Sequence, residues 1–195
     1  MTKEEHIQRL KDDPIYVVMG EALSLGRKNT EVAKTLLDVG VRIIQYREKH
    51  KTWREKYAEA SEIAVMCKKY GATFIMNDSV DLAVACGADG IHVGQDDAPV
   101  QIVKKIAGQN VFVGVSTNTT KELQGPMFPT SSKSDADEVV TEETIRSALE
   151  FPLPVVTIGG IGLANIRTLY DRGFRSFAMI SAVVSQKDIK KAVDD

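Results

Sequence analysis

The chain has 195 residues and a net charge of −2, with 43% hydrophobic and 27% charged residues, which is the composition of an ordinary globular protein with a sizeable core. This charge gives no reason to expect nucleic acid or a membrane surface as a partner, and no apolar run is long enough to span a bilayer. The first residues lack the apolar core of a signal peptide, and Cys67 and Cys86 lack metal-ligand spacing. We therefore expect one cytoplasmic domain over residues 1–195.

Strands and helices are predicted to alternate along the whole chain. Seven short apolar runs predict buried strands at residues 14–19, 41–45, 73–76, 90–93, 111–115, 154–158 and 176–180. Helices are predicted at residues 2–12, 30–39, 52–70, 80–86, 99–107, 142–150, 163–172 and from 186 onward. Because several strands are apolar on both faces, the pattern indicates a parallel sheet covered by helices.

The helices also carry predictions for single residues. Apolar spacing places Ile7 and Leu10 on the inner side of the first helix and leaves His6 on the surface. Asn29 or Thr30 is the expected N-cap of the second helix. The expected inward residues of the third helix are Tyr57, Ala60, Ile63, Ala64 and Cys67.

An open doubly wound sheet and a closed (β/α)8 barrel both satisfy this alternation. Polar residues at the end of nearly every strand favour the barrel, whose active site gathers at that rim. Only residues 116–124 separate the fifth strand from Gly125-Pro126-Met127-Phe128, which is too short for a helix plus a strand of about 15 residues. We therefore expect an α/β fold, a (β/α)8 TIM barrel in which the helix 5/strand 6 region is missing or shortened.

Two aspartates follow neighbouring predicted strands. Asp78 ends the run Phe74-Ile75-Met76-Asn77-Asp78, and Asp97 ends the run that starts at Gly90. Parallel neighbours place their carboxyl ends about 5 Å apart, so the two carboxylates could share one hard cation. Spacing alone leaves a second interpretation equally open, in which each aspartate only starts a helix as an N-cap.

Three loops carry groups that suit phosphate. Alternation sends Gln45, Arg47 and Lys49 to one side of their strand end, and the two cations suit a phosphate or diphosphate. Gly159-Gly160 ends a strand and leads into a helix, and the next strand ends in Ile180-Ser181, which is the usual position of a phosphate site in barrels. The third loop, Thr130-Ser131-Ser132-Lys133, is hydroxyl-rich and carries one cation. Solvated loops without a role remain the alternative interpretation for the first and third loops.

With these motifs in order, the chain resembles the thiamine phosphate synthase family over about residues 14–190. The resemblance rests on the following runs: Gln45-Tyr46-Arg47-Glu48-Lys49, Phe74–Asp78, Ala88–Asp97, Gly114-Val115-Ser116, Gly125–Thr130 with Lys133, Ile158-Gly159-Gly160-Ile161 and Met179-Ile180-Ser181. It implies an enzyme that couples 4-amino-2-methyl-5-(diphosphooxymethyl)pyrimidine with a thiazole phosphate. The products would be thiamine phosphate and pyrophosphate, formed by a dissociative substitution.

The resemblance also implies a role for each motif. Asp78 and Asp97 fall on positions that hold Mg²⁺, the expected cofactor. The expected pyrimidine diphosphate ligands are Gln45, Arg47, Lys49, Asn77, Ser116 and Lys133, and we add Tyr46 and Glu48 to the substrate-binding set. The expected thiazole phosphate ligands are Thr130, Ser131, Ser132, Gly160, Ile180 and Ser181. Arg47, Lys49 and Lys133 are the expected catalytic residues, because negative charge grows on the leaving pyrophosphate.

Small-molecule substrates are thus the expected partners, and a homo-oligomer is compatible with the sequence. A thiazole tautomerase-like relative is one alternative, although it would not need the paired aspartates or the Arg47/Lys49 pair. A non-catalytic phosphate-ligand-binding barrel is another, favoured only by the short region near residues 117–125. For that region we favour residues missing from this sequence between about Thr120 and Gly125 over a genuine seven-stranded barrel. Consecutive Cα atoms there should then lie far beyond 3.8 Å apart.

Overall fold

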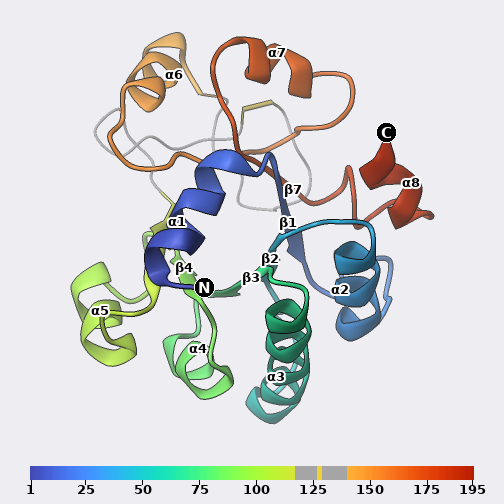
Figure 1. The fold of residues 1–195 in the computed structure, drawn as a ribbon, viewed down its shortest axis with the longest axis vertical. Helices are drawn as coiled ribbons and strands as arrows, with labels where there is room; N and C mark the ends of the chain where they lie inside the picture. Colours follow the sequence, from blue (N-terminus) through green and yellow to red (C-terminus); the bar gives the residue numbers. More distant parts are fainter. Residues whose placement is uncertain (117–126, 129–139) are drawn as a thin grey trace.

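Strand and helix alternate in the structure as they do in the predicted pattern (Figure 1). A computed structural model describes residues 1–116, 127–128 and 140–195. Its strands are β1 (Ile15–Met19), β2 (Ile43–Tyr46), β3 (Thr73–Asn77), β4 (Gly90–Val93), β5 (Phe112–Val115), β6 (Thr157–Ile158) and β7 (Phe177–Met179). Its helices are α1 (Lys3–Asp12), α2 (Asn29–Asp38), α3 (Trp53–Lys69), α4 (Val80–Cys86), α5 (Val100–Ala107), α6 (Glu142–Leu149), α7 (Ile166–Asp171) and α8 (Ile189–Asp194).

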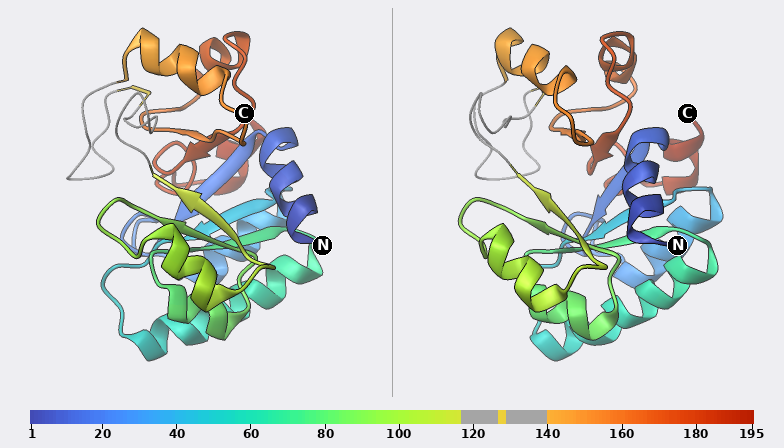
Figure 2. Two further views of the ribbon diagram at one scale, coloured as in Figure 1. Left: turned by 90° about the vertical axis from the view of Figure 1, so that its left-hand side faces the viewer. Right: turned by 60° about the vertical axis from the view of Figure 1, so that its left-hand side comes forward.

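The strands form one parallel sheet in the order β5-β4-β3-β2-β1-β7-β6. In its centre, β1 pairs with β2 on one side and with β7, from the far end of the chain, on the other. Helices α2 to α5 lie around one part of the curled sheet, and α6 and α7 lie beyond its other end (Figures 1 and 2). The predicted α/β, TIM-barrel-like fold is therefore confirmed, with seven strands in the described residues.

Burial on both faces explains why the strands read as continuous apolar runs. All four residues of β2 are buried, and so are four of the five residues in β1 and in β3. One face meets the helices and the other meets the side chains that fill the curled sheet, so neither face needs polar residues. Phe74, Ile43 and Ile75 are among the largest fully buried side chains of this core.

Within the described residues, β5 and β6 are the two ends of the sheet. The Met127 amide donates to the Ile158 carbonyl (2.9 Å) and the Phe128 amide donates to the Gly159 carbonyl (3.0 Å). This dipeptide is therefore hydrogen-bonded to the edge of β6 opposite β7. The other residues of the shortened region, and the expected gap between about Thr120 and Gly125, lie outside the described residues.

Helix α1 closes the end of the sheet at which the strands begin, and it corrects the prediction for His6. His6 is buried rather than on the surface: its Nδ1 lies 2.8 Å from Thr73 Oγ1 and its Nε2 lies 3.1 Å from Asp89 Oδ1. The inner face of α1 is thus formed by His6 and Leu10, four residues apart, while Ile7 is half-buried. Hydrophobic spacing missed the histidine because its two polar partners come from distant segments.

Other predictions at helix boundaries and faces were wrong in smaller ways. Asn29 lies inside α2, which begins after Lys28 without a side-chain cap, and its amide donates to the carboxylates of Glu48 and Glu59. Tyr57 is 39% exposed instead of facing inward. Strand β6 is shorter than predicted, and α7 and α8 each begin three residues later than predicted. By contrast, Thr52 and Glu55 form a full capping box at the start of α3.

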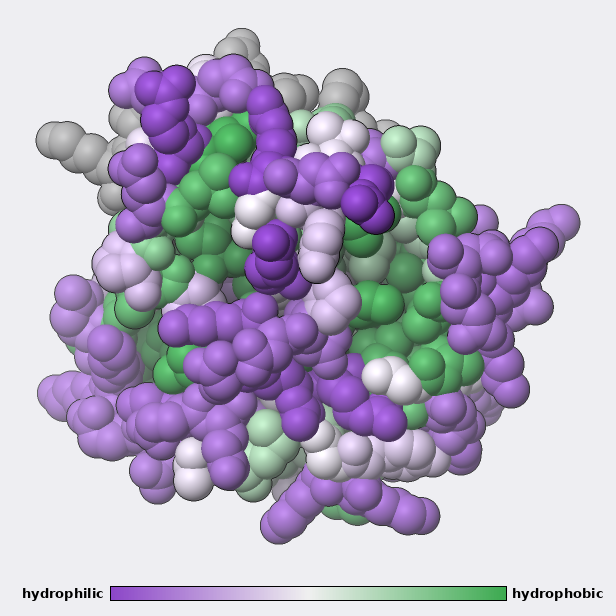
Figure 3. Space-filling model, turned by 45° about the horizontal axis from the view of Figure 1, so that its top comes forward, coloured by the Kyte–Doolittle hydropathy of each residue, from purple (hydrophilic) through white to green (hydrophobic). Residues whose placement is uncertain are grey.

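The surface of the molecule is mixed in polarity. Figure 3 shows apolar surface on both sides of a hydrophilic middle. The exposed large apolar residues include Leu153 and Leu163, which lie before and after the short strand β6. In the ranges that the structure describes, no helix combines the length and the apolar composition needed to cross a membrane.

The buried His6 predicts a pH dependence of stability. Burial lowers the pKa of His6 below its ordinary value, against the attraction of Asp89, while the N-terminus and Arg9 add to the lowering and Glu5 opposes it. Between that lowered pKa and the ordinary value near 6.5, the unfolded chain binds more protons than the folded chain. The free energy of unfolding therefore falls as the pH falls through this window.

His6→Gln, whose amide does not titrate, should lose part of this dependence. The measurement is urea unfolding of wild type and variant at pH 7.5 and at pH 5.5. The decrease between the two pH values should be smaller in His6→Gln. An equal decrease in both proteins would contradict the assignment to His6.

Candidate functional site

Three neighbouring strands deliver most of the predicted site residues to one rim. In register, Tyr46 of β2 lies beside Met76 of β3, and Asn77 of β3 lies beside His92 of β4. The loops after these strands therefore leave the sheet side by side at its carboxyl end, where barrel active sites form. These loops carry Arg47 and Lys49, then Asp78, then Asp97.

Asp78, Lys49 and Asp97 form a compact charged cluster at this rim. Lys49 Nζ lies 2.8 Å from Asp78 Oδ2, and the Gly94 amide donates to Asp97 Oδ2 (2.7 Å). Asp78 has a φ of 61°, in the left-handed region that few non-glycine residues occupy, and its amide donates to the His92 carbonyl (2.8 Å). The backbone of Asp78 is thus held in an unusual conformation by the neighbouring strand.

The two carboxylates of the cluster affect each other's pKa. Burial raises the pKa of Asp78, but hydrogen bonds from Lys49 and Asp97 and the charges of Lys49 and Arg47 bring it below its ordinary value. The pKa of Asp97 is raised, by burial and by Asp78, against the opposing hydrogen bond from the Gly94 amide. Two carboxylates that perturb each other in opposite directions share one small site.

Gln45 lies deeper, inside the curled sheet. It is buried, and its Nε2 donates to the Tyr16 hydroxyl oxygen (2.5 Å). Burial raises the pKa of Tyr16, so this phenol stays protonated at neutral pH. Tyr16 was not among the site residues predicted from the sequence. Two features could have indicated it: it is the one polar residue of β1, and strand alternation places its side chain on the same inward face as that of Val18.

Ser116 lies at the end of β5, on the other side of the cluster. His92 Nε2 lies 2.8 Å from Ser116 Oγ, and Gln95 Nε2 donates to the Ser116 carbonyl (2.5 Å). A Cβ on Gly114 would lie 2.9 Å from His92 Nδ1, so the small residue makes room for the imidazole. His92 thus joins β4 to the end of β5 through its hydrogen bond with Ser116.

Two residues of the predicted substrate-binding set turn their side chains away from this cluster. The Tyr46 hydroxyl donates to Glu59 of α3 (2.8 Å), and the side chain is fully buried. Glu48 Oε2 accepts hydrogen bonds from the Glu21 amide and from Asn29 of α2. Both side chains thus face the α2 and α3 side, because strand alternation opposes them to Gln45, Arg47 and Lys49.

A second group of predicted residues lies after β6 and β7, which are neighbours in the sheet. Gly159 and Gly160 have φ values of 103° and 62°, which only glycine adopts readily. The Asn165 side chain closes this turn, donating to the Gly160 carbonyl and accepting from the Gly162 amide (both 2.9 Å). Ser181 is exposed after β7 while Ile180 is buried. The helix expected directly after the glycines begins only at Ile166.

The remaining predicted residues, Thr130, Ser131, Ser132 and Lys133, lie outside the described residues. In the described ranges, no group of three or more His, Cys, Asp or Glu side chains is placed to hold a metal. The protein's share of a cation site at the rim would thus be the pair Asp78 and Asp97.

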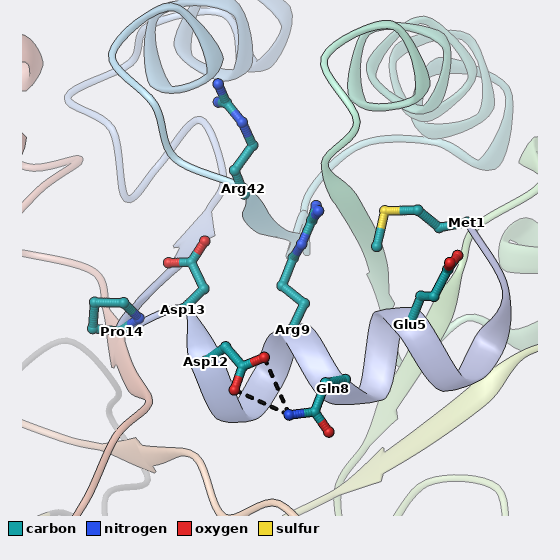
Figure 4. A pocket seen from close by; sticks show the side chains of 8 residues that line it. All are labelled: Met1, Glu5, Gln8, Arg9, Asp12, Asp13, Pro14 and Arg42. Atoms are coloured by element: carbon teal, nitrogen blue, oxygen red, sulfur yellow. Dashed lines mark hydrogen bonds between the residues drawn. The ribbon is translucent and has the colours of Figure 1, made fainter.

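One cavity of the molecule lies away from this rim. It has a volume of about 600 Å³ and is lined by α1 and by residues just before β1 and β2, at the amino end of the sheet (Figure 4). Its polar groups already have partners within the chain: Gln8 donates to Asp12 and Arg42 to the Leu37 carbonyl. A cavity of about 90 Å³ at the rim is lined by Arg47 and Lys49, among others. Because the charged loops converge there, the rim is the candidate site.

The Lys49–Asp78 pair predicts a measurable change in titration. Lys49→Met removes the hydrogen bond and the positive charge that lower the pKa of Asp78, so that pKa should rise. Carboxyl ¹³C shifts of labelled protein against pH measure it. Lys34→Met is a matched control, because Lys34 bonds to Asp38 (2.7 Å) and should change the titration of Asp38 alone. An unchanged Asp78 titration in Lys49→Met would overturn the described pair.

Comparison with known proteins identifies the family of the chain. A family model described as thiamine monophosphate synthase matches residues 15–183. A thiamine-phosphate synthase from Caldicellulosiruptor saccharolyticus is 37% identical over 206 residues, covering 99% of this chain and 93% of the relative. That span exceeds the 195 residues of this chain, so the relative has residues without a counterpart here. One from Dictyoglomus thermophilum is 38% identical, covering 97% and 91%.

A solved structure gives the same result. The thiamine phosphate pyrophosphorylase from Pyrococcus furiosus superimposes with a TM-score of 0.83 at 30% identity, covering 95% of this chain and 94% of that one. The chain belongs to the thiamine monophosphate synthase family.

Proposed function

We propose that this transferase couples 4-amino-2-methyl-5-(diphosphooxymethyl)pyrimidine with a thiazole phosphate, using Mg²⁺ at Asp78 and Asp97. The observation that carries the proposal is the rim cluster, in which two mutually perturbing carboxylates lie beside Lys49. A diphosphate brings several negative charges, so it needs a cation between itself and these carboxylates. The family membership of the chain supports the choice of substrates.

The donor set at the rim fits Mg²⁺. This ion takes one or two carboxylates from a protein and completes its octahedron with water and substrate phosphate oxygens. Asp78 and Asp97 supply such a pair, and no larger cluster is present in the described residues. When bound, the ion would neutralise charge that develops on the leaving pyrophosphate. Hard oxygen ligands also admit Mn²⁺.

The chain's own residues would act in two ways. Arg47 and Lys49 bind the diphosphate and stabilise the charge that grows on it as the C–O bond to the pyrimidine methylene breaks. Gln45, Asn77 and Ser116 orient the pyrimidine part over the sheet interior. The thiazole nitrogen then captures the pyrimidinylmethyl cation, a step that needs no general base.

The thiazole phosphate is assigned to the loops after β6 and β7. Gly160 allows close backbone approach to the phosphate, and Ser181 offers an exposed hydroxyl beside it. Ile180, which precedes Ser181, is buried and would line this phosphate site from the interior. Lys133 and the hydroxyls of Thr130, Ser131 and Ser132 remain predicted ligands from the sequence.

Neither alternative function accounts for the rim as well. A tautomerase-like protein moves a proton and has no diphosphate to bind, so it leaves the Asp78–Asp97 pair unexplained. A non-catalytic phosphate-binding barrel has no need for cations placed beside a leaving group. Assay of purified protein with both substrates distinguishes these functions, because only the proposed enzyme releases pyrophosphate.

The central test is substitution of the two aspartates. Asp78→Asn and Asp97→Asn keep size and polarity but remove one negative charge each, so coupling should fall by orders of magnitude in either variant. Asp96→Asn is the matched control, because Asp96 is adjacent but exposed, and it should retain activity. Pyrophosphate release is measured across a range of Mg²⁺ concentrations. Full activity of both variants in the presence of chelator would refute the metal assignment.

Gly160 tests the second phosphate site. Gly160→Asn tolerates the left-handed backbone better than other residues do, yet its Cβ occupies the space that a phosphate would need. The variant should raise the KM for the thiazole phosphate and leave that of the pyrimidine diphosphate unchanged. Equal increases for both substrates would indicate general damage to the sheet.

A further inference from the structure

The first turn of α3 and the first turn of α4 are connected by a hydrogen bond at the rim. Trp53 Nε1 donates to Asp81 Oδ2 at 2.6 Å. Trp53 follows Lys49 by four residues, and Asp81 follows Asp78 by three, so this bond joins the two loops that meet in the rim cluster. In the described residues, two side-chain hydrogen bonds connect these segments, Trp53–Asp81 and Lys49–Asp78.

The indole is held in place although it is 50% exposed. It stacks on Tyr57, one turn further along α3, with ring centroids 5.3 Å apart and an angle of 13° between the planes. Such offset aromatic pairs add to the stability of a fixed orientation. The capping box of Thr52 and Glu55 fixes the same turn of the helix. Trp53 is the only tryptophan of the chain.

The two connections differ in what happens when a substrate complex forms. Lys49 Nζ bonds to Asp78 Oδ2, and both the cation and the diphosphate of the proposed function would compete for these groups. The Lys49–Asp78 bond is then broken or weakened when it would be most useful for alignment. The Trp53–Asp81 bond involves neither a proposed ligand nor a proposed catalytic group, so it persists.

We propose that Trp53 and Asp81 are positioning residues that hold the Lys49 loop against the Asp78 loop while the magnesium diphosphate is bound. The inference rests on the proposed function, because it assigns both loops to one ligand. It predicts that breaking the bond weakens binding of that ligand without removing any group that touches it.

The test uses calorimetric titration of the full chain with magnesium pyrophosphate. Trp53→Phe keeps a ring to stack on Tyr57 but loses the donor, and Asp81→Ala loses the acceptor. Each should raise the Kd about two- to tenfold, the range that one hydrogen bond spans. Asp81→Asn retains an acceptor oxygen and should bind as wild type does. The double variant Trp53→Phe/Asp81→Ala should bind no more weakly than the weaker single variant.

A matched control lies at the other end of α3. The Tyr70 hydroxyl, directly after the last residue of α3, donates to Asp38 of α2 at 2.6 Å, which is also an exposed bond from an aromatic side chain to an aspartate. Tyr70→Phe should therefore leave the Kd unchanged. Tryptophan emission provides a check that is independent of binding, since it should shift in Asp81→Ala and stay at the wild-type position in Asp81→Asn.

Kinetics separates positioning from damage to the fold. Trp53→Phe and Asp81→Ala should raise the KM for the pyrimidine diphosphate, with kcat within about twofold of wild type and the KM for the thiazole phosphate unchanged. Wild-type Kd values in both variants, or an equal increase in Tyr70→Phe, would overturn the inference and leave the proposed function intact. Failure of the wild-type protein to bind magnesium pyrophosphate would overturn both.

Discussion

The parallel pairing of β2, β3 and β4 is the constraint on which the candidate site depends. Their backbone hydrogen bonds fix a register in which the three strands end beside one another. Charged residues that follow these strands, separated by tens of residues in the sequence, are therefore delivered to one place. The bond from the Asp78 amide to the His92 carbonyl extends this register by one step past the end of β3, which is why Asp78 turns sharply at the rim.

Stability does not explain the charged cluster that results. An ion pair as exposed as Lys49–Asp78, whose side chains are 50% and 24% exposed, contributes about 0–1 kcal/mol. Placing Asp97 beside Asp78 opposes folding, because like charges repel and the pKa of Asp97 rises. Without a bound metal ion, the contribution of the cluster to folding stability is thus near zero or unfavourable. Residues that perturb each other in this way at a rim are typical of functional sites.

Sequence reasoning located most of the fold, because the signals are local. Apolar runs identified the seven strands of the described residues, and α4 ends as predicted, at Gly87 in the left-handed conformation. It failed where distant segments decide the outcome. His6 is polar, and only the folded sheet brings Thr73 and Asp89 to it. Asn29 suited an N-cap, but its side-chain amide binds the carboxylates of Glu48 and Glu59, and Asn29 is the first residue of α2 instead of its cap.

The site residues were likewise predicted where local signals sufficed and missed where distant segments decide their contacts. Strand alternation correctly separated the side chains of Gln45, Arg47 and Lys49 from those of Tyr46 and Glu48, although the latter two entered the predicted substrate-binding set with the motif. Spacing left Asp78 and Asp97 open between helix starts and a cation pair, since the distance between their carboxylates depends on the strand register. The Trp53–Asp81 bond had no signal in the sequence, because each residue alone reads as an exposed helix position.

The place of β1 in the sheet has a consequence for how the protein is made. Its partner β7 comes almost at the end of the chain, with Ile15 beside Phe177, and α1 before it docks on Thr73 and Asp89. During synthesis β1 leaves the ribosome long before its partner β7 exists. The pairing of β1 with β7 therefore forms only after the chain has been made as far as Met179, whereas β2, Thr73 and Asp89 can contact β1 and α1 earlier.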